Sequence, residues 1–392
     1  MPDTPALRIP PPAFLAAPGL RAVLAALPGA RVVGGAVRDA LAGREVADID
    51  LATGMRPEEV TTRLLNAGLK AVPTGIDHGT VTAVADHRGF EVTTLRRDIE
   101  TDGRHAVVDY TDNWRADAAR RDFTINAMSL APDGAVFDYF GGIADLRAGC
   151  VRFVGDAATR IAEDYLRILR FFRFHARYGS GAPDAAALAA IRAGMPGMAR
   201  LSAERVWSEL KRILATADPC DSVMLMQATG VLAAVLPEGT APARLAALRA
   251  AGAPPDPLLR LAALLQGDAA ALATRLRFSA AERDRLLALR SGDVPPDDAD
   301  NATLRRALAD TPAYILDGRA WLAGRDAALR ARLAAMPRPV FPLRGRDLAA
   351  AGVAPGPRLG QLLAQIRAWW MAGGCVADAA ACRAELARLL AD

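Results

Sequence analysis

The chain has 392 residues, of which 52% are hydrophobic, and its formal net charge at pH 7 is +4. This length and composition are typical of a globular protein with two or more domains. Because no run of about eighteen apolar residues occurs and prolines at 10 to 12 interrupt the N-terminal apolar stretch, we expect neither a membrane span nor an export signal.

The basic residues are almost all arginine, because only Lys70 and Lys211 among the 48 are lysine. This skew, beside a high alanine content, is typical of a genome-wide bias. Arginine counts alone therefore do not indicate nucleic-acid binding, and only arginines at a defined spacing do. The four cysteines lack the spacing of a zinc site or a disulfide framework, so we expect reduced thiols and a cytoplasmic protein. Nothing in the sequence predicts a protein partner.

Up to about residue 150, short alternating runs mix with helical stretches. The runs that predict strands are ARVVGG, DIDLAT, KAVPTG, GTVTAVAD, GFEVTTLR, MSLAP and AVFDYF. A turn at residues 86–89 predicts a hairpin that carries Glu91 onto a sheet face. The polar segment 98–115 has no firm period and predicts a mobile loop.

The stretch GGAVRDALAGREVADIDLATG, residues 34–54, begins with a turn that ends a strand and opens a helix. Gly34 and Gly35 leave backbone N–H groups accessible at a positive helix terminus, an arrangement that suits a phosphate. Arg38 adds a cation beside them. We therefore expect these three residues to bind the phosphates of a nucleotide.

Asp48 and Asp50 follow in the same stretch, separated by Ile49. On a strand, alternate residues project to one face, so both carboxylates would point the same way with Ile49 behind them. Two anions so close need a cation, most simply Mg²⁺, which would also hold a nucleoside triphosphate. A solvated strand edge or a helix N-cap explains the D-x-D pattern alone, but its position after the Gly-Gly-x-x-Arg turn favours the metal.

The second motif, RRDFTINAM at residues 120–128, places two arginines and an aspartate before a strand-like run. Arg121 could meet phosphate oxygens, and Asp122 could accept a hydrogen bond from a ribose hydroxyl. Taken alone, the motif is equally well explained as a helix end with an asparagine side-chain cap.

The third motif is EDYLRILRFFRF, in which polar residues recur at steps of three: Asp164, Arg167, Arg170 and Arg173. On a helix this spacing gives a slowly winding polar stripe between apolar sides. Asp164 can accept from the exocyclic amino group of cytosine or adenine while Arg167 donates to the adjacent ring nitrogen. Guanine and uracil present the opposite polarity and would leave polar groups unpaired. The alternative is an i to i+3 salt bridge on an exposed helix face.

Beyond about residue 156, leucine, alanine and arginine recur at helical spacing with Gly or Pro breaks, so we expect a string of helices.

In this order the three motifs resemble the class II tRNA nucleotidyltransferase and bacterial poly(A) polymerase family. The first looks like its catalytic head motif, the second its ribose and phosphate motif, and the third its nucleotide-selecting helix. The resemblance covers residues 30–215, including LSAERVWSELKRIL, and is weaker towards the C-terminus. Some relatives carry a metal phosphohydrolase domain with a His-Asp pair, but this chain has Gln266 and Gly267 there.

The resemblance implies a role for each residue of the head motif. Gly35 and Arg38 would contact the incoming triphosphate, and Asp48 and Asp50 would bind Mg²⁺ and act in catalysis. Glu91 matches a carboxylate proposed as a third catalytic acid in relatives, although a glutamate on a solvated hairpin face is an equal alternative.

The other two motifs would bind the nucleotide. The resemblance implies that Arg121 touches it, and that Asp164 and Arg167 read its base. Arg170 and Arg173 would assist with the base or the phosphates.

We therefore expect an α+β fold with a mixed-sheet nucleotidyltransferase head domain at 1–150. An all-helical remainder would follow it, with a neck that carries the nucleotide-selecting helix at 151–220. A body and tail at 221–392 would bind tRNA.

The predicted function is that of a Mg²⁺-dependent CCA tRNA nucleotidyltransferase. It would add C, C and A, without a template, from CTP and ATP to a tRNA lacking its 3′ CCA end, with release of pyrophosphate. A poly(A) polymerase, or an enzyme restricted to A or CC addition, is the alternative within the family. A catalytically silent RNA-binding protein is the alternative outside it.

Overall fold

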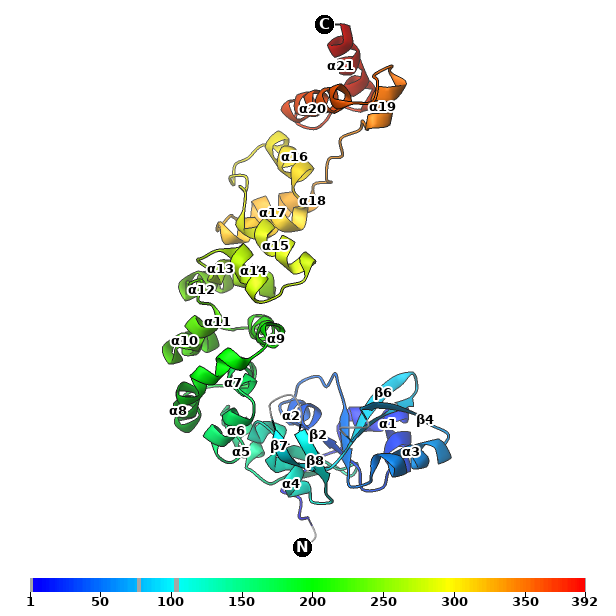
Figure 1. The fold of residues 1–392 in the computed structure, drawn as a ribbon, viewed down its shortest axis with the longest axis vertical. Coiled ribbons are helices and arrows are strands. Elements are labelled where there is room, and N and C mark those ends of the chain that lie inside the picture. The colour runs from blue at the N-terminus through cyan, green and yellow to red at the C-terminus, as the bar shows by residue number, and fades with distance from the viewer. Residues whose placement is uncertain (1–2, 76–78, 102–105, 392) are drawn as a thin grey trace. The chain divides into compact units, whose positions relative to one another are not determined.

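The computed structural model describes residues 3–75, 79–101 and 106–391. It divides into two compact units, Met1–Val235 and Leu236–Asp392 (Figure 1). The first unit combines a mixed sheet with helices and the second is built from helices, which confirms the predicted α+β fold. The finer boundaries at residues 150 and 220 stay predictions.

One large sheet forms the centre of the first unit, with the strand order β1-β10-β9-β2-β3-β6-β5-β4. β3 pairs with β6 in parallel, and the other pairings are antiparallel. The strands are β1 (Leu7–Arg8), β2 (Arg31–Val33), β3 (Asp50–Thr53), β4 (Lys70–Gly75), β5 (Thr80–Ala85), β6 (Arg88–Thr94), β9 (Met128–Leu130) and β10 (Ala135–Asp138).

Each predicted strand is present, but the loop expected over 98–115 is wrong. The structure has a separate antiparallel pair there, β7 (Arg96–Thr101) and β8 (Ala106–Tyr110), although residues 102–105 of the expected loop lie outside the described part. Pairing of the two backbones satisfies their peptide groups whatever the side-chain pattern, which is why alternation did not reveal these strands.

The β5–β6 hairpin has a two-residue turn, because Ala85 pairs with Arg88. Asp86 and His87 have φ angles of 49° and 60°, the left-handed conformations of a type I′ turn. The predicted hairpin is confirmed, and the other edge of its strand β6 pairs in parallel with β3, which sets Glu91 beside Asp50.

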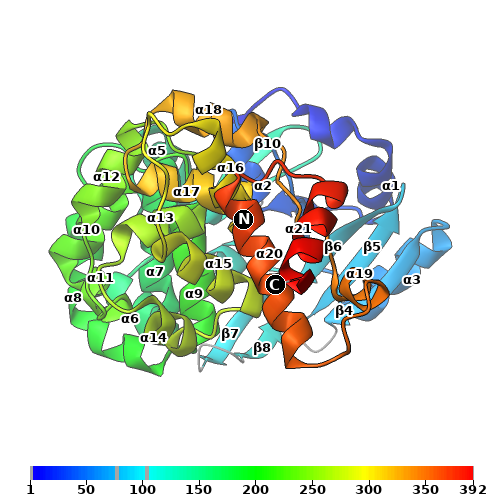
Figure 2. The same cartoon turned by 90° about the horizontal axis from the view of Figure 1, so that it is seen from above.

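Helices α1 (Pro18–Ala26) and α3 (Pro57–Asn66) lie against the β4–β6 part of the sheet (Figures 1 and 2). Apolar residues of these helices and of α2 (Gly35–Leu41) form one core with the strands, including the fully buried Leu20 and Leu64. This core holds β2, β3 and the start of α2 in place, so the glycine turn is built on rigid elements.

The rest of the first unit is helical. Its longer helices are α6 (Ala157–Glu163), α7 (Leu166–Tyr178), α8 (Ala185–Gly194), α9 (Ala203–Leu214) and α10 (Cys220–Thr229). A cluster of phenylalanines joins α7 to the sheet region, because the ring of Phe123 lies 4.8 Å from Phe153 and 5.1 Å from Phe174, between centroids. Such aromatic packing contributes about 0.5–1.5 kcal/mol per pair beyond burial and fixes α7 against the second motif.

The second unit contains α12 (Pro242–Ala250), α13 (Pro257–Leu264), α14 (Ala269–Arg275), α15 (Ala280–Arg290), α16 (Asn301–Asp310), α17 (Ala313–Leu322), α18 (Ala327–Ala335), α19 (Gly345–Ala350), α20 (Pro357–Ala372) and α21 (Ala379–Ala391). Asp256 caps α13 and Ser279 forms a capping box with Glu282 at the start of α15. Across the described part of the chain, no helix combines the length and the apolar character that a membrane crossing needs.

Candidate active site

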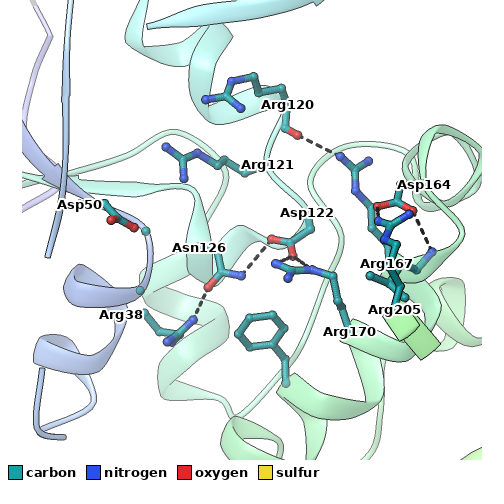
Figure 3. Close-up of a pocket in the computed structure, with 14 residues that line it drawn as sticks. Arg38, Asp50, Arg120, Arg121, Asp122, Asn126, Asp164, Arg167, Arg170 and Arg205 are labelled. Atoms are coloured by element: carbon teal, nitrogen blue, oxygen red, sulfur yellow. Dashed lines mark hydrogen bonds and ion pairs between the residues drawn. The ribbon is translucent and has the colours of Figure 1, made fainter. Parts of the chain in front are cut away.

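A cleft of about 420 Å³ opens in the first unit, where all three sequence motifs meet (Figure 3). Its lining is Gly34, Gly35, Arg38, Asp50, Arg120, Arg121, Asp122, Asn126, Asp164, Leu166, Arg167, Arg170, Phe174 and Arg205. Of the predicted site residues, Asp48, Glu91 and Arg173 are not in this lining. One cleft therefore brings together a carboxylate of the head motif and the acid and arginine predicted to read the base.

The glycine turn leaves one wall of the cleft open. Gly34 has a φ of 67°, and a Cβ there would lie 3.4 Å from Nη1 of Arg121. Glycine adopts this left-handed conformation without strain, and its lack of a side chain gives the arginine room.

Arg38 is almost fully buried at the cleft and is held from three sides. Its Nε donates to Oδ1 of Asp39 at 3.1 Å, and its Nη1 donates to Oδ1 of Asn126. The ring of Tyr178 lies 4.4 Å from its guanidinium carbon. These contacts fix the guanidinium in one orientation, which suits recognition of a phosphate.

The predicted pair of acidic residues does not lie on one strand. β3 begins at Asp50, and Asp48 lies in the irregular segment before it, so the same-face argument is wrong for Asp48. The third acid comes from β6, because Glu91 is the direct neighbour of Asp50 across the parallel pairing.

Charge at Asp50 is poorly compensated. Although its side chain reaches solvent, burial of the carboxylate raises its pKa, Glu91 and Asp48 raise it further, and Arg121 lowers it in part. Carboxylate oxygens with excess negative charge suit a hard divalent cation. In the described ranges no three His, Cys, Asp or Glu side chains already converge as metal ligands. The donor set fits a cation that would draw these carboxylates together.

Arg120 and Arg121 share Asp117 of helix α4 (Trp114–Ala119), at 2.7 Å and 3.4 Å. Burial of Asp117 raises its pKa, but the charges of Arg121 and Arg120 outweigh that effect and the net pKa is lowered. Asp117 thus stays ionised and holds Arg121 beside Asp50 and Gly34.

Asp122 forms the middle of a buried chain of hydrogen bonds across the cleft floor (Figure 3). Its Oδ1 accepts from the Phe123 N–H and from Nδ2 of Asn126, both at 2.9 Å, and its Oδ2 accepts from Nε of Arg170 at 2.7 Å and from Nη2. Asn126 in turn accepts from Arg38.

These bonds use all four lone-pair positions of the Asp122 carboxylate. Burial raises its pKa, but the charge of Arg170 and the hydrogen bonds from Asn126 and Arg170 outweigh burial and lower it. An interaction with ribose would have to displace one of these bonds, so the geometry favours positioning of Arg170 and Asn126. The strand-like run expected after Asp122 is wrong for Thr124–Asn126, which form a 3-10 helix, and a strand begins only at Met128.

Asp164 is not on the predicted helix. It lies in the break between α6 and α7, where its Oδ1 accepts from the Leu166 N–H at 3.1 Å. Its ion-pair partner is Arg205 of α9 at 2.7 Å, which differs from the salt bridge with Arg167 that a shared helix face would give. An extended backbone at Asp164 ends α6 and lets the carboxylate reach the cleft.

Arg167 lies in the first turn of α7 and faces the same cleft. It forms an ion pair with Glu163, donates to the Arg160 carbonyl at 2.8 Å and donates to the Arg120 carbonyl at 3.3 Å. Asp164 and Arg167 are therefore adjacent but bound to other groups, and reading a base would exchange some of these contacts for the base edge.

The arginines at the next two steps of the stripe separate. Arg170 lines the cleft, whereas Arg173 lines a second cleft of about 790 Å³. Nε of Arg173 lies 3.1 Å from Oε2 of Glu209. Burial lowers the pKa of Arg173 to about 10, although Glu209 raises it in part. The predicted role of Arg173 in nucleotide binding stays a prediction.

Five lining residues were not predicted: Arg120, Asn126, Leu166, Phe174 and Arg205. The first four lie inside the second and third motifs, where they were given no role in the site. Arg205 lies in LSAERVWSELKRIL, more than thirty residues from the motif whose aspartate it binds, and only the packing of α9 against α7 reveals it.

The sheet, the glycine turn and a cleft that combines Asp50 with several arginines define a nucleotidyltransferase. Residues 30–152 match the family model described as the poly A polymerase head domain. Residues 182–241 match the model described as a probable RNA and SrmB-binding site of polymerase A.

The chain belongs to the CCA tRNA nucleotidyltransferase family. It is 38% identical over 359 residues to the mitochondrial CCA tRNA nucleotidyltransferase 1 of Danio rerio, which covers 87% of this chain and 83% of that protein. The human protein of the same name is 37% identical, with 88% and 83% covered. The crystal structure of the Bacillus stearothermophilus CCA-adding enzyme in complex with CTP has a TM-score of 0.71 and 28% identity, covering 88% of this chain and 89% of that one.

Proposed function

We propose that this enzyme adds C, C and A, in that order and without a template, to the 3′ end of tRNA that lacks them. The substrates would be CTP and ATP. The observation that supports this function is the shared cleft, whose lining includes Asp50 from β3 and both Asp164 and Arg167 from the α6–α7 region.

Asp50, together with Asp48 and Glu91, would hold Mg²⁺. When bound, this metal would neutralise the triphosphate and lower the pKa of the primer's terminal hydroxyl. The raised pKa of Asp50 supports the assignment, since a carboxylate crowded by other anions gains from a cation.

The chain's own arginines would position the triphosphate for in-line displacement. The primer oxygen bonds to the α-phosphorus while the bond from that phosphorus to the bridging oxygen breaks, and pyrophosphate leaves with that oxygen. Arg38 and Arg121 line the cleft beside the glycine turn, so they would stabilise the charge on the leaving phosphates.

Selection of the base would fall to Asp164 and Arg167. Asp164 retains acceptor capacity beyond its bonds to Leu166 and Arg205, and Arg167 presents a planar donor fork at the start of α7. Cytosine and adenine offer a donor next to an acceptor and would fit this pair.

A cytoplasmic location is part of the proposal. The four cysteines are free thiols, which supports a reducing compartment.

Incubation of the protein with tRNA lacking CCA and with each nucleoside triphosphate, separately and in sequence, tests the function. Ordered incorporation of C, C and A that then stops is expected. An unlimited A tail would identify a poly(A) polymerase, and addition of A alone or of CC alone would identify a restricted enzyme. Binding of tRNA with no incorporation by the unmodified protein would identify a silent RNA-binding protein.

A further inference from the structure

One face of the β4–β5–β6 part of the sheet carries side-chain hydroxyls and leads up to the acidic residues of the nucleotide cleft. On β5, Val81 is buried in the core, on the face where α1 and α3 pack. Thr80 and Thr82 alternate with it, so their side chains lie on the other face. Their partners on β6, Thr93 and Glu91, share that face. We call this surface the hydroxyl face, and its members are Thr74, Thr80, Thr82, Glu91 and Thr93.

Thr82 has a defined orientation on the hydroxyl face. Its Oγ1 lies 2.7 Å from Oγ1 of Thr74 on β4, which is hydrogen-bond distance. Its methyl group lies towards Gly89, where an added Cβ would come within 3.1 Å of Cγ2. Two hydroxyls that share one hydrogen bond keep one proton to donate and lone pairs to accept. The pair therefore offers both a donor and an acceptor to a ligand at an exposed position.

The register of the strands sets Thr82 in one row with the acidic residues. Thr82 pairs with Glu91 of β6, and Glu91 pairs with Asp50 of β3. Neighbouring strands are about 4.8 Å apart, so Thr82 lies one strand beyond Glu91 and two beyond Asp50. Within the described ranges, the lining of the nucleotide cleft does not include Thr82. A group held at Thr82 would thus lie beside Glu91 but outside the space for the incoming nucleotide.

The strand order places Thr82 and the glycine turn on opposite sides of Asp50. Gly34 follows β2 and Thr82 belongs to β5, in the order β2-β3-β6-β5. In an in-line displacement, the attacking and leaving oxygens lie on opposite sides of the phosphorus. Because the leaving phosphates would bind at the glycine turn, the hydroxyl face lies on the side from which the attacking primer would approach.

We propose that Thr82, oriented by Thr74, binds the 2′-hydroxyl of the primer's last ribose and makes the reaction selective for an RNA end over a DNA end. A 2′-hydroxyl is both donor and acceptor, which matches this pair, and it is the group that distinguishes RNA from DNA. Since the 2′- and 3′-hydroxyls are on adjacent carbons, a 2′-hydroxyl held at Thr82 leaves the 3′-hydroxyl beside Glu91 and Asp50. The identity of the ligand as a primer end rests on the proposed function.

The test compares two tRNA primers lacking CCA that differ only in the last sugar, ribose or 2′-deoxyribose, both of which keep the 3′-hydroxyl. The full-length protein should add the first C to the ribose-ended primer with a kcat/KM about fivefold higher. Thr82→Val removes the hydroxyl and suits a strand equally well, so kcat/KM should fall about fivefold for the ribose-ended primer and stay unchanged for the other. KM for CTP should not change, because Thr82 lies outside the lining of the nucleotide cleft.

Binding measured without metal or nucleotide gives a second readout. The Kd of the ribose-ended primer should rise about threefold in Thr82→Val, and the Kd of the deoxyribose-ended primer should not change. Thr82→Ser keeps the hydroxyl and should restore the preference for ribose. Thr74→Val removes the orienting partner and should reduce that preference, which keeps the test valid if Thr82→Val perturbs folding.

Thr62→Val is the matched control, because Thr62 is exposed on α3, outside the hydroxyl face, and its hydroxyl donates to the Glu58 carbonyl at 2.9 Å. It should leave the preference unchanged. An unchanged preference in Thr82→Val, or an equal loss with both primers, would overturn the proposal, since a threonine pair that only stabilises the sheet does not distinguish the two sugars. Equal use of both primers by the unmodified protein would overturn it as well. Failure of the unmodified protein to add C to either primer would refute the proposed function instead.

Discussion

The two sides of the nucleotide cleft are built on opposite electrostatic principles. On the sheet side, Asp50 lies next to Glu91 and near Asp48; burial raises the pKa of its carboxylate, and these like charges raise it further. On the helix side, Asp122 and Asp164 are each paired with an arginine. The first side is short of positive charge until a substrate complex forms, whereas the second is already satisfied and fixed in geometry. Removal of a charge should therefore abolish chemistry on the first side and change stability or selectivity on the second.

The largest effect is expected from Asp50→Asn. Incorporation of CMP into tRNA should fall by at least about 10³-fold, because the carboxylate that would hold the metal is lost. The thermal midpoint should rise, because a raised folded-state pKa means that the charged form is disfavoured in the fold. The same raised pKa means that the protonated form of Asp50 stabilises the parent fold. This contribution to the free energy of unfolding is greatest at low pH and is lost as pH rises through the folded-state pKa.

Glu45→Gln is the control for Asp50→Asn, since Glu45 is an exposed carboxylate in the segment before β3 and outside the cleft lining. It should leave activity and thermal midpoint unchanged. Full activity of Asp50→Asn would contradict the claim that loss of a charge on the sheet side of the cleft abolishes chemistry.

Asp122→Asn should mainly destabilise the protein, by about 3 kcal/mol in the free energy of unfolding, because it leaves the half-buried Arg170 without its carboxylate partner. The lowered pKa of Asp122 contributes stability above the unfolded-state pKa, and that contribution is lost as pH falls through the folded value. Urea unfolding at pH 7 and at a pH well below 3.8, the ordinary pKa of an aspartate, should show a smaller difference between variant and parent at the lower pH.

Asp145→Asn provides the comparison for Asp122, because Asp145 is also buried, accepts from Thr124 Oγ1 at 2.6 Å and pairs with Arg152 outside the cleft. Both variants should lose stability, but only Asp122→Asn should raise KM for CTP. Equal KM values in the two variants would show that the hydrogen-bond chain to Arg38 does not position the nucleotide site.

Arg205→Gln should reduce discrimination more than rate. Without its 2.7 Å partner, Asp164 would adopt other orientations, and the ratio of kcat/KM for CTP over UTP should fall about tenfold, or about 1.4 kcal/mol. Arg192→Gln on the exposed surface of α8 should leave this ratio unchanged. If the ratio of kcat/KM for CTP over UTP is unchanged in Arg205→Gln, then Arg205 of α9 does not position Asp164 for base selection.

The smallest effect is expected from Tyr178→Phe. The Tyr178 hydroxyl donates to Asp39, which holds Arg38, so its loss should raise KM for CTP about threefold, in line with about 0.7 kcal/mol for one hydrogen bond. Tyr139→Phe removes a similar hydroxyl, bonded to Asp3 at 2.6 Å and outside the cleft, and should not change KM. A similar KM for CTP in both variants would show that the hydrogen bond from Tyr178 to Asp39 does not contribute to nucleotide binding.

The sequence by itself determined the local elements and the residue types of the site. Alternating runs marked every strand of the large sheet except the two-residue β1. The order of the three motifs identified the family and named Gly34, Arg38, Asp50, Arg121 and Arg170 for the cleft, because glycine turns and charged spacings are local signals.

Tertiary structure decided the partners of those residues. The parallel register of β3 and β6 set Glu91 beside Asp50, and the packing of α9 against α7 set Arg205 against Asp164. In the folded chain, Asp164 lies in the break after α6 and not on the expected helix, and Arg173 lines a second cleft. Contacts between residues far apart in the chain depend on packing and register, which periodicity and spacing do not encode.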